Sequence, residues 1–125
     1  MKQHTRNQPD RQIFDTRAAA DYLGIDLQTV RWHVNVKGDL APDKRIGGRF
    51  MVFTRETLDA YQEGRKPDPN LPPLYSTKEA AEYLGMTVDG IAYHIHREDN
   101  LEPDLRVAGR LVFTQETLDA FKRSS

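Results

Sequence analysis

Apolar residues recur at helical spacing in a short segment near the start of the chain. Ala19, Ala20 and Leu23 lie one to four positions apart, as the buried face of a helix requires. Asp15 precedes them as a candidate N-cap, and Gly24 follows as a residue able to adopt the left-handed conformation that ends a helix. The pattern therefore predicts a short helix that stops in a tight turn.

A second apolar segment begins directly after this turn. Asp26 is a candidate N-cap, and the buried positions Val30 and Val34 are four apart in a helix that we expect to run to about Val36. Ile25 is placed to fill the turn. Two helices joined by so tight a glycine-containing turn predict a helix-turn-helix.

The next apolar segment has the composition of a β-hairpin. Residues 45–53, Arg-Ile-Gly-Gly-Arg-Phe-Met-Val-Phe, place apolar and β-branched residues on either side of a glycine-containing turn. Thr54 then caps a last helix, in which Leu58 and Tyr61 are three apart and close the core. Helix, turn, helix, two-stranded wing and helix together predict a winged helix-turn-helix.

The whole pattern occurs twice. Residues 16–49 align with 77–110 and residues 53–61 align with 113–121, with 20 of 43 positions identical and one residue fewer in the second wing. A repeat of this length predicts two domains with the same fold. The predicted parts are a flexible N-terminal arm (1–12), a first domain (13–61), a proline-rich linker (62–73) and a second domain (74–122). We expect a mainly α fold with small β-hairpin wings, in two tandem winged helix-turn-helix domains.

The second copy repeats the helix signals. Ser76 and Glu79 have the Ser-x-x-Glu spacing of a capping box. Gly85 repeats the turn and Thr87 the cap of the second helix, which we expect to run to about Arg97.

Composition and charge narrow the class of protein. The chain has no cysteine, no apolar run near the roughly 18 residues that cross a bilayer, and no apolar stretch of a secretory signal at its start. We therefore expect a cytoplasmic protein with no membrane partner. The net charge of −1 argues against a protein that coats nucleic acid by bulk electrostatics, so any nucleic-acid binding has to come from a local basic face. The first copy carries +1 (residues 16–61) and the second −3 (residues 77–125), so the second copy is the acidic one.

The strings STKEAAEYLG and TRAAADYLG, then RIGGR or RVAGR, then FTRETLDAY or FTQETLDAF, resemble the MerR-like and excisionase-type winged helix-turn-helix domains of bacteria and phages. The resemblance covers both copies and implies a DNA-binding regulator, a recombination directionality factor or another small DNA-site reader. The long dimerisation helix or ligand domain of MerR-type sensors does not follow the second copy, so we expect no small-molecule effector.

The resemblance implies that the second helix of each copy lies in the major groove. The exposed candidates are Gln28, Thr29, Arg31, Trp32 and Asn35 in the first copy, and Asp89, Gly90, Ala92, Tyr93 and His96 at the same positions of the second. Arginine, glutamine and asparagine have the geometry to read guanine and adenine edges. Because Asp89 and Ala92 are poorer readers, we expect the first copy to be the main base reader.

Arginines at the two hairpins are the second set of candidates. They are Arg45 and Arg49 in the first wing and, aligned with them, Arg106 and Arg110 in the second. An arginine beside a glycine turn can approach phosphates or a minor groove closely. The alternative is that these arginines are solvated and pair with Asp43 and Asp104.

Aromatic and histidine positions have two interpretations each. Trp32, replaced by Tyr93 in the second copy, suits packing on a sugar or a methyl group, or equally covering a junction between the domains. His33 and His94 are identical between the copies and are expected at the edge of the core rather than as ligands. His94 and His96 are two apart and point to different helix faces, with no cysteine or third histidine nearby, so we expect no metal and no cofactor.

The two segments outside the copies, the N-terminal arm and the linker, also have two interpretations each. The arm contains Lys2, His4, Arg6 and Arg11, which suit a minor groove, although the arm equally suits a disordered tail. Four prolines in the linker, Pro67, Pro69, Pro72 and Pro73, favour an extended polyproline II spacer or a brace. No phosphate-binding glycine loop and no cysteine nucleophile occurs, so we expect no enzyme.

Two functions remain. The first is sequence-specific binding of double-stranded DNA by a small regulator or excisionase-like factor. The alternative is a protein-interaction adaptor in which the acidic second copy binds another protein. If DNA is the partner, either both copies read one composite site or the domains pack together with one recognition helix occluded.

Overall fold

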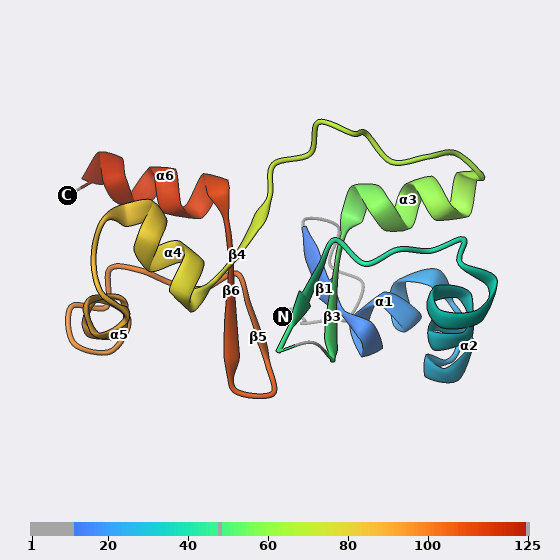
Figure 1. The fold of residues 1–125 in the computed structure, drawn as a ribbon, viewed down its shortest axis with the longest axis horizontal. Helices are drawn as coiled ribbons and strands as arrows, with labels where there is room; N and C mark the ends of the chain where they lie inside the picture. Colours follow the sequence, from blue (N-terminus) through green and yellow to red (C-terminus); the bar gives the residue numbers. More distant parts are fainter. Residues whose placement is uncertain (1–11, 48, 125) are drawn as a thin grey trace, which may run out of the picture. The chain divides into compact units, whose positions relative to one another are not determined.

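The computed structural model describes residues 12–47 and 49–124. The chain divides into two compact units, Met1–Leu71 and Pro72–Ser125, which we call unit 1 and unit 2. Each unit contains a strand, two helices, a β-hairpin and a final helix in the same order (Figure 1). The predicted N-terminal arm, including Lys2, His4, Arg6 and Arg11, lies outside the described residues.

The elements of unit 1 are β1 (Ile13–Asp15), α1 (Thr16–Leu23), α2 (Leu27–Trp32), the π-helix η1 (His33–Lys37), β2 (Lys44–Ile46), β3 (Phe50–Thr54) and α3 (Arg55–Glu63). Those of unit 2 are β4 (Leu74–Ser76), α4 (Thr77–Leu84), α5 (Val88–His96), β5 (Leu105–Val107), β6 (Arg110–Thr114) and α6 (Gln115–Ser124). The fold is therefore rich in helix, with small antiparallel sheets, and is compatible with a winged helix-turn-helix.

The helix ends follow the predicted caps. The Asp15 carboxylate accepts a hydrogen bond from the backbone N–H of Ala18 at 2.8 Å, and Ser76 with Glu79 forms both bonds of a capping box. Gly24 ends α1 with φ of 72° and donates its N–H to carbonyls of the last turn. The short first helix and the tight turn are therefore confirmed.

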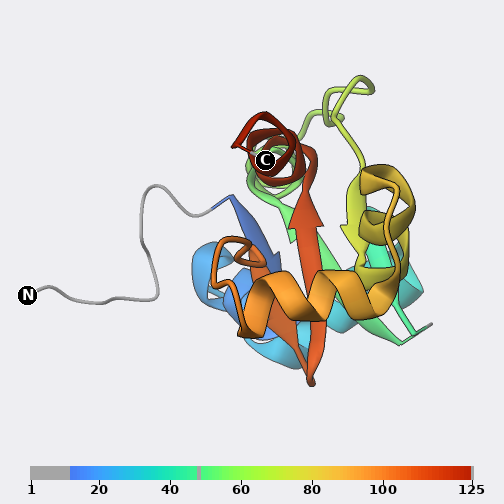
Figure 2. The same cartoon turned by 90° about the vertical axis from the view of Figure 1, so that its left-hand side faces the viewer.

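Each sheet has three strands, where the sequence predicted two. β1 pairs antiparallel with β3, which also pairs with β2, and β4, β6 and β5 repeat the arrangement. The third strand buries Ile13 and Phe14 against the core, with Phe14 opposite Phe53. Because β1 is three residues long and leads directly into the Asp15 cap, it is too short to show strand alternation. In unit 2, the tip of the β5–β6 hairpin points away from α6 (Figure 1 and Figure 2).

Each unit has its own hydrophobic core, placed where the helices meet the sheet. The core of unit 1 contains Phe14, Ala19, Ala20, Val30, Leu40, Met51, Phe53 and Leu58. That of unit 2 contains Ala80, Ala81, Ile91, Ile95, Leu101, Phe113, Leu118 and Phe121. As predicted, Leu58 is fully buried and Tyr61 packs against the same cluster. Among the residues described, no helix is long and apolar enough to cross a membrane.

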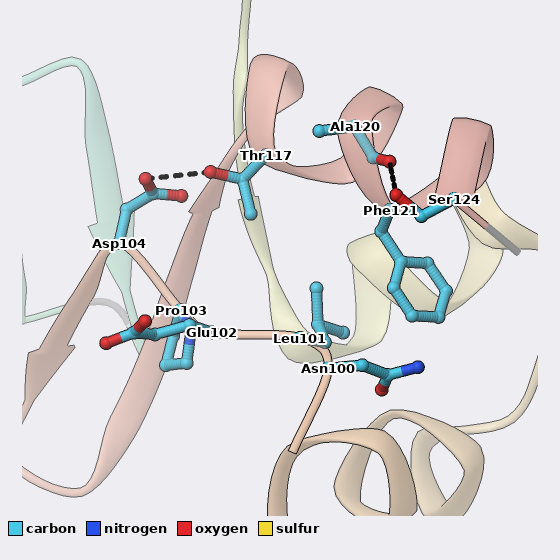
Figure 3. Close-up of a pocket in the computed structure, with 9 residues that line it drawn as sticks. All are labelled: Asn100, Leu101, Glu102, Pro103, Asp104, Thr117, Ala120, Phe121 and Ser124. Atoms are coloured by element: carbon cyan, nitrogen blue, oxygen red, sulfur yellow. Dashed lines mark hydrogen bonds between the residues drawn. The ribbon is translucent and has the colours of Figure 1, made fainter. Parts of the chain in front are cut away.

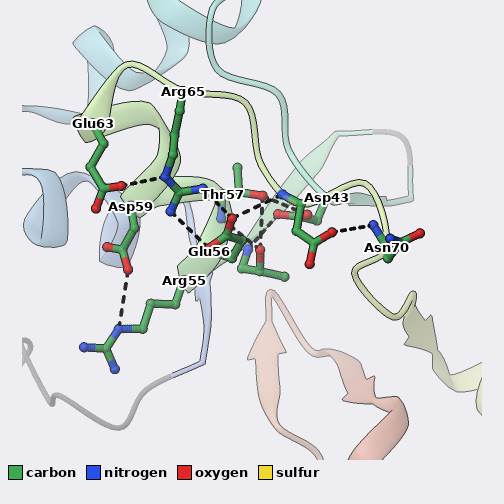
Figure 4. Close-up of polar contacts among 10 residues, drawn as sticks. Asp43, Arg55, Glu56, Thr57, Asp59, Glu63, Arg65 and Asn70 are labelled. Carbon is green, nitrogen blue, oxygen red and sulfur yellow. Dashed lines mark hydrogen bonds and ion pairs between the residues drawn. The ribbon is translucent and has the colours of Figure 1, made fainter.

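The predicted linker, residues 62–73, is partly attached to unit 1. α3 includes its first two residues, and Arg65 then binds back to α3 with Nη1 2.7 Å from Glu56 Oε2 and Nε 2.6 Å from Glu63 Oε1 (Figure 4). The N–H of Asp68 also donates to Glu56, at 3.1 Å, and these bonds from Arg65 and Asp68 lower the pKa of Glu56. Continuous polyproline II over the whole segment is therefore wrong, because its first half is held against α3.

Candidate nucleic-acid interface

The second helix of unit 1 is built from α2 and η1. Its start is fixed by Asp26, whose carboxylate accepts from the N–H of Thr29 at 2.7 Å. Val30 is completely buried, whereas Val34, expected to be buried, is half-buried against the core. The last turn is wider than that of an α-helix, because the N–H of Gly38 bonds to the carbonyl of His33, five residues back, at 2.8 Å. The sequence did not reveal this π-turn, since apolar positions four apart suit both windings.

One face of this helix gathers the predicted base-reading residues. Gln28, Thr29, Arg31, Trp32 and Asn35 line a shallow hollow together with Asp26, His33 and Val36. Thr29 is half-buried and the other four are exposed. Within the described part of the chain, the side chains of Gln28, Arg31 and Asn35 form no hydrogen bond or ion pair. Their donors and acceptors are therefore available to an external partner.

The matching face of unit 2 has a different chemistry. Asp89, Ala92, Tyr93 and His96 are exposed on α5, and Gly90 is half-buried. The hydroxyl of Tyr93 donates to Glu98 Oε2 at 2.8 Å, and this bond together with the negative charge of Glu98 raises the pKa of Tyr93. Where unit 1 has Lys37 and Gly38, unit 2 has Glu98 and Asp99. This face is therefore more acidic than that of unit 1.

Arg49 and Arg110 lie at non-equivalent positions of the two wings, so their alignment is wrong. In register, Ile46 faces Phe50 in unit 1 and Val107 faces Arg110 in unit 2. The structural counterpart of Arg110 is thus Phe50, and the additional residue of unit 1 lies in its turn. Arg49 is in that turn, with its guanidinium 5.4 Å from the centre of the Phe50 ring. The sequence alignment matched the two identical Gly-Arg pairs and so placed the one-residue gap after them. The strand pairing shows that the additional residue lies in the turn instead.

Arg45 and Arg106 are the two wing arginines that do correspond. Each lies at the middle of an outer strand, β2 or β5, and each is exposed. In the described ranges, neither forms a hydrogen bond or ion pair. The alternative expected solvated arginines that pair with Asp43 and Asp104. The wing arginines are exposed, but the described residues contain no ion pair between them and either carboxylate, so the pairing is wrong.

Asp43 connects the wing to the start of α3. Its Oδ2 accepts from the N–H of Thr54 at 2.7 Å and its Oδ1 from the hydroxyl of Thr57 at 2.9 Å (Figure 4). Asp104 repeats both bonds, to Thr114 and Thr117, at the same distances. These bonds give the shared aspartate and the shared Thr-x-x-Thr sequence the same structural role in the two copies.

A hollow in unit 2 adds no candidate to this interface. It lies between the loop after α5 and α6 and is lined by Asn100, Leu101, Glu102, Pro103, Asp104, Thr117, Ala120, Phe121 and Ser124 (Figure 3). Asp104 is bonded to Thr117 there, and Ser124 donates to the carbonyl of Ala120 at 3.0 Å. The bond from Thr117 thus joins the loop to α6, and the hydroxyl of Ser124 is satisfied within α6.

The two-residue turn of the second wing predicts a stabilising substitution. Ala108 and Gly109 both have positive φ, 51° and 79°, as in a type I′ turn. Alanine in the left-handed region is strained by roughly 1 kcal/mol, whereas asparagine tolerates it. We expect Ala108→Asn to raise the free energy of unfolding of unit 2 by about 0.5 to 1 kcal/mol. Urea unfolding followed by amide NMR signals of β5 and β6 measures it, and an unchanged or lower midpoint would contradict the strain.

The shared histidines are at the core edge, as expected. The ring of His33 meets Tyr61 edge-on at 5.2 Å and its Nδ1 lies 2.8 Å from Asp39 Oδ1. His94 makes the same contacts with Phe121, at 4.9 Å, and with Asn100, at 3.1 Å. The residues that the structure describes contain no group of three His, Asp or Glu side chains placed to hold a metal ion.

The difference between Asp39 and Asn100 predicts a difference in acid stability. Desolvation opposes ionisation of Asp39, but the hydrogen bond and charge of His33 hold the pKa of Asp39 below its ordinary value. A carboxylate with a lowered pKa stabilises the fold above its unfolded pKa of about 4 and loses this effect as pH falls through the folded pKa. We expect Asp39→Asn to destabilise unit 1 at pH 7 and to flatten its loss of stability below about pH 4.

Fluorescence of Trp32, the single tryptophan of the chain, reports unfolding of unit 1 in this experiment. If the wild type and Asp39→Asn had parallel stability curves between pH 7 and pH 2, the pairing of His33 with Asp39 would make no contribution.

Part of the chain is similar to a known protein family. Residues 13–66 match a family model described as a helix-turn-helix domain. The chain has no match among curated proteins or solved structures. The matched range includes every element of unit 1, from β1 to α3, and therefore both the second helix and the wing. Residues 13–66 thus form a helix-turn-helix domain.

Proposed function

We propose that the chain is a sequence-specific double-stranded DNA-binding protein whose main reader is unit 1. The helix formed by α2 and η1 enters the major groove, and Arg45 and Arg49 contact the backbone. One observation carries the proposal. In a helix-turn-helix domain, the second helix presents Gln28, Arg31 and Asn35 to solvent, and none of them has a partner among the described residues.

The arrangement of charges supports DNA binding through specific contacts to bases rather than through overall electrostatic attraction. The chain as a whole has a net charge of −1, so its affinity for arbitrary duplex is low. Arg31, Arg45 and Arg49 supply positive charge on unit 1. Arginine bonds guanine with two parallel hydrogen bonds, whereas glutamine and asparagine do so with adenine. A few such contacts select a sequence while neutralising few phosphates.

Both units are winged helix-turn-helix domains in this proposal, of the MerR-like and excisionase type. The support is that unit 2 repeats the order of elements, the capped first helix and the Asp104 bonds of unit 1. The chain acts by occupying its site, as a small regulator or excisionase-like factor without catalysis. The role of unit 2 on DNA is then auxiliary, because its α5 face carries Asp89 and is followed by Glu98 and Asp99.

A composite site read by both units is a further part of the proposal. The free connection is shorter than residues 62–73 suggest, because Asp68 is held to Glu56. From Asp68 to Leu74 the chain spans at most about 22 Å, at up to about 3.6 Å per residue. If both units dock, tethering raises the effective concentration of the second. The alternative to a composite site is that the two units pack together and cover one of the two recognition helices.

A second candidate function is a protein-interaction adaptor. The observation that favours it is the acidic surface around the end of α5, where the hydroxyl of Tyr93 is already bonded to Glu98. This surface repels phosphates and suits a basic protein. In that case unit 2, and not unit 1, would carry the main contacts.

Selection from a pool of randomised duplexes separates these functions. We expect the purified chain to enrich one motif and to bind it with a shallow salt dependence, because log affinity falls by about 0.9 per phosphate contact for each log unit of salt. Failure to enrich any motif and to retard any duplex at low salt would reject DNA binding.

A further inference from the structure

We propose that Val36 and Trp32 together form a contact for the 5-methyl group of a pyrimidine in the major groove. The occupant is thymine, because thymine is the base that carries a 5-methyl group in an unmodified duplex. This inference rests on the proposed DNA binding of unit 1 and adds the apolar part of its specificity.

The structure leaves both side chains unusually open to solvent. Val36 is 69% exposed and Trp32 is 47% exposed, and neither belongs to the core of unit 1. They lie four residues apart on one helix and line the same hollow. The two apolar side chains therefore lie in the same hollow as Gln28, Arg31 and Asn35, the residues expected to read bases.

The size of this patch favours a base edge over a protein. Two side chains supply far less than the roughly 800 Å² per partner that a stable protein interface buries. A methyl group needs only a contact of this scale.

The polar neighbours point to the same occupant. Gln28 precedes Trp32 by four residues, and Arg31 and Asn35 form a second row beside it on the same hollow. The hollow therefore presents hydrogen-bonding groups around an apolar centre. A base edge in the major groove offers donors, acceptors and one kind of apolar group, the pyrimidine 5-methyl.

Local structure restricts this contact to unit 1. Val36 lies in η1, the wide final turn that Gly38 closes onto His33, whereas the corresponding helix α5 ends at His96. Unit 2 has Arg97 in place of Val36, and its Tyr93 is bonded to Glu98. Among the described residues, an exposed valine four positions from an aromatic ring without a hydrogen-bond partner is thus found in unit 1 and not in unit 2.

Removing single methyl groups from the DNA tests the inference. In the duplex that the intact chain selects, each thymine is replaced in turn by deoxyuridine, and each cytosine in turn by 5-methylcytosine. We expect the affinity of the wild type to fall about fourfold when one particular thymine is replaced by deoxyuridine, the equivalent of about 0.8 kcal/mol for one buried methyl-sized group. A loss with deoxyuridine at one thymine supports the inference, whereas a gain with 5-methylcytosine and no loss with deoxyuridine would overturn it.

The variant Val36→Ala should bind the methylated duplex about fourfold more weakly and should no longer distinguish it from the demethylated one. Arg97→Ala, the matched change in unit 2, should retain the full difference. Equal methyl dependence in Val36→Ala and the wild type, or no dependence at any position, would overturn the inference. Because these outcomes require a selected duplex, they are distinct from failure of the proposed function, in which no duplex is selected.

Discussion

Replacing Arg31 with alanine lowers the affinity for the selected duplex by about 1 to 3 kcal/mol and removes the preference at one base position. The expected loss is large because Arg31 is exposed in the hollow on the second helix of unit 1 and has no hydrogen-bond or ion-pair partner among the described residues. A bidentate contact to guanine is lost with the guanidinium. Titrations with the selected duplex and with its single-base variants measure both effects.

The comparison between units serves as the control for this prediction. Trp32→Ala and Tyr93→Ala change matched positions, and we expect the change in unit 2 to have the smaller effect. Tyr93 is bonded to Glu98 and lies beside acidic residues, so it contributes less to a contact with DNA. Equal losses from the two substitutions would reject unit 1 as the main reader.

Replacing Asp43 with alanine lowers the free energy of unfolding of unit 1 by about 2 to 3 kcal/mol. The carboxylate accepts two bonds at the start of α3, and Thr57, which is 5% exposed, would be left with Thr54 as its remaining side-chain partner. Units of this size have total stabilities of only a few kcal/mol. The variant should therefore begin to unfold at a markedly lower temperature, as followed by Trp32 fluorescence.

Asp104→Ala is the matched control for that experiment. It removes the same two bonds in unit 2, where no tryptophan reports. The Trp32 transition should therefore stay close to that of the wild type, while amide signals of α6 disappear at lower temperature. If Asp43→Ala left the Trp32 transition unchanged, Asp43 would not be the connection between wing and helix.

The helices were predictable because their signals are local. Asp15, Gly24 and Asp26 each act within one turn of the chain, and the structure shows each in its predicted role. β1 was missed because it is defined by pairing with β3, some forty residues later, rather than by its own pattern. The register of the wings was missed for the same reason, since strand pairing is a non-local property.

The candidate interface was predicted in part. Gln28, Arg31 and Asn35 lie on one helix face, which follows from their spacing around Val30. The sequence analysis did not identify Val36 as an exposed candidate, because an apolar residue at the end of an apolar helix is normally interpreted as part of the core. Its spacing of four from Trp32 was the available signal. The anchoring of Arg65 to Glu56 had no signal in the proline pattern, because it depends on side chains from two segments.

Methylation interference on the selected duplex tests the central claim most directly. Methyl groups at guanine N7 block the major groove, and those at adenine N3 block the minor groove. If the second helix of unit 1 reads the major groove, N7 methylation of at least one guanine must prevent binding of the wild type, and Arg31→Ala must become insensitive to it. Binding that tolerates N7 methylation at every guanine, or equal sensitivity in Arg31→Ala, would contradict the account.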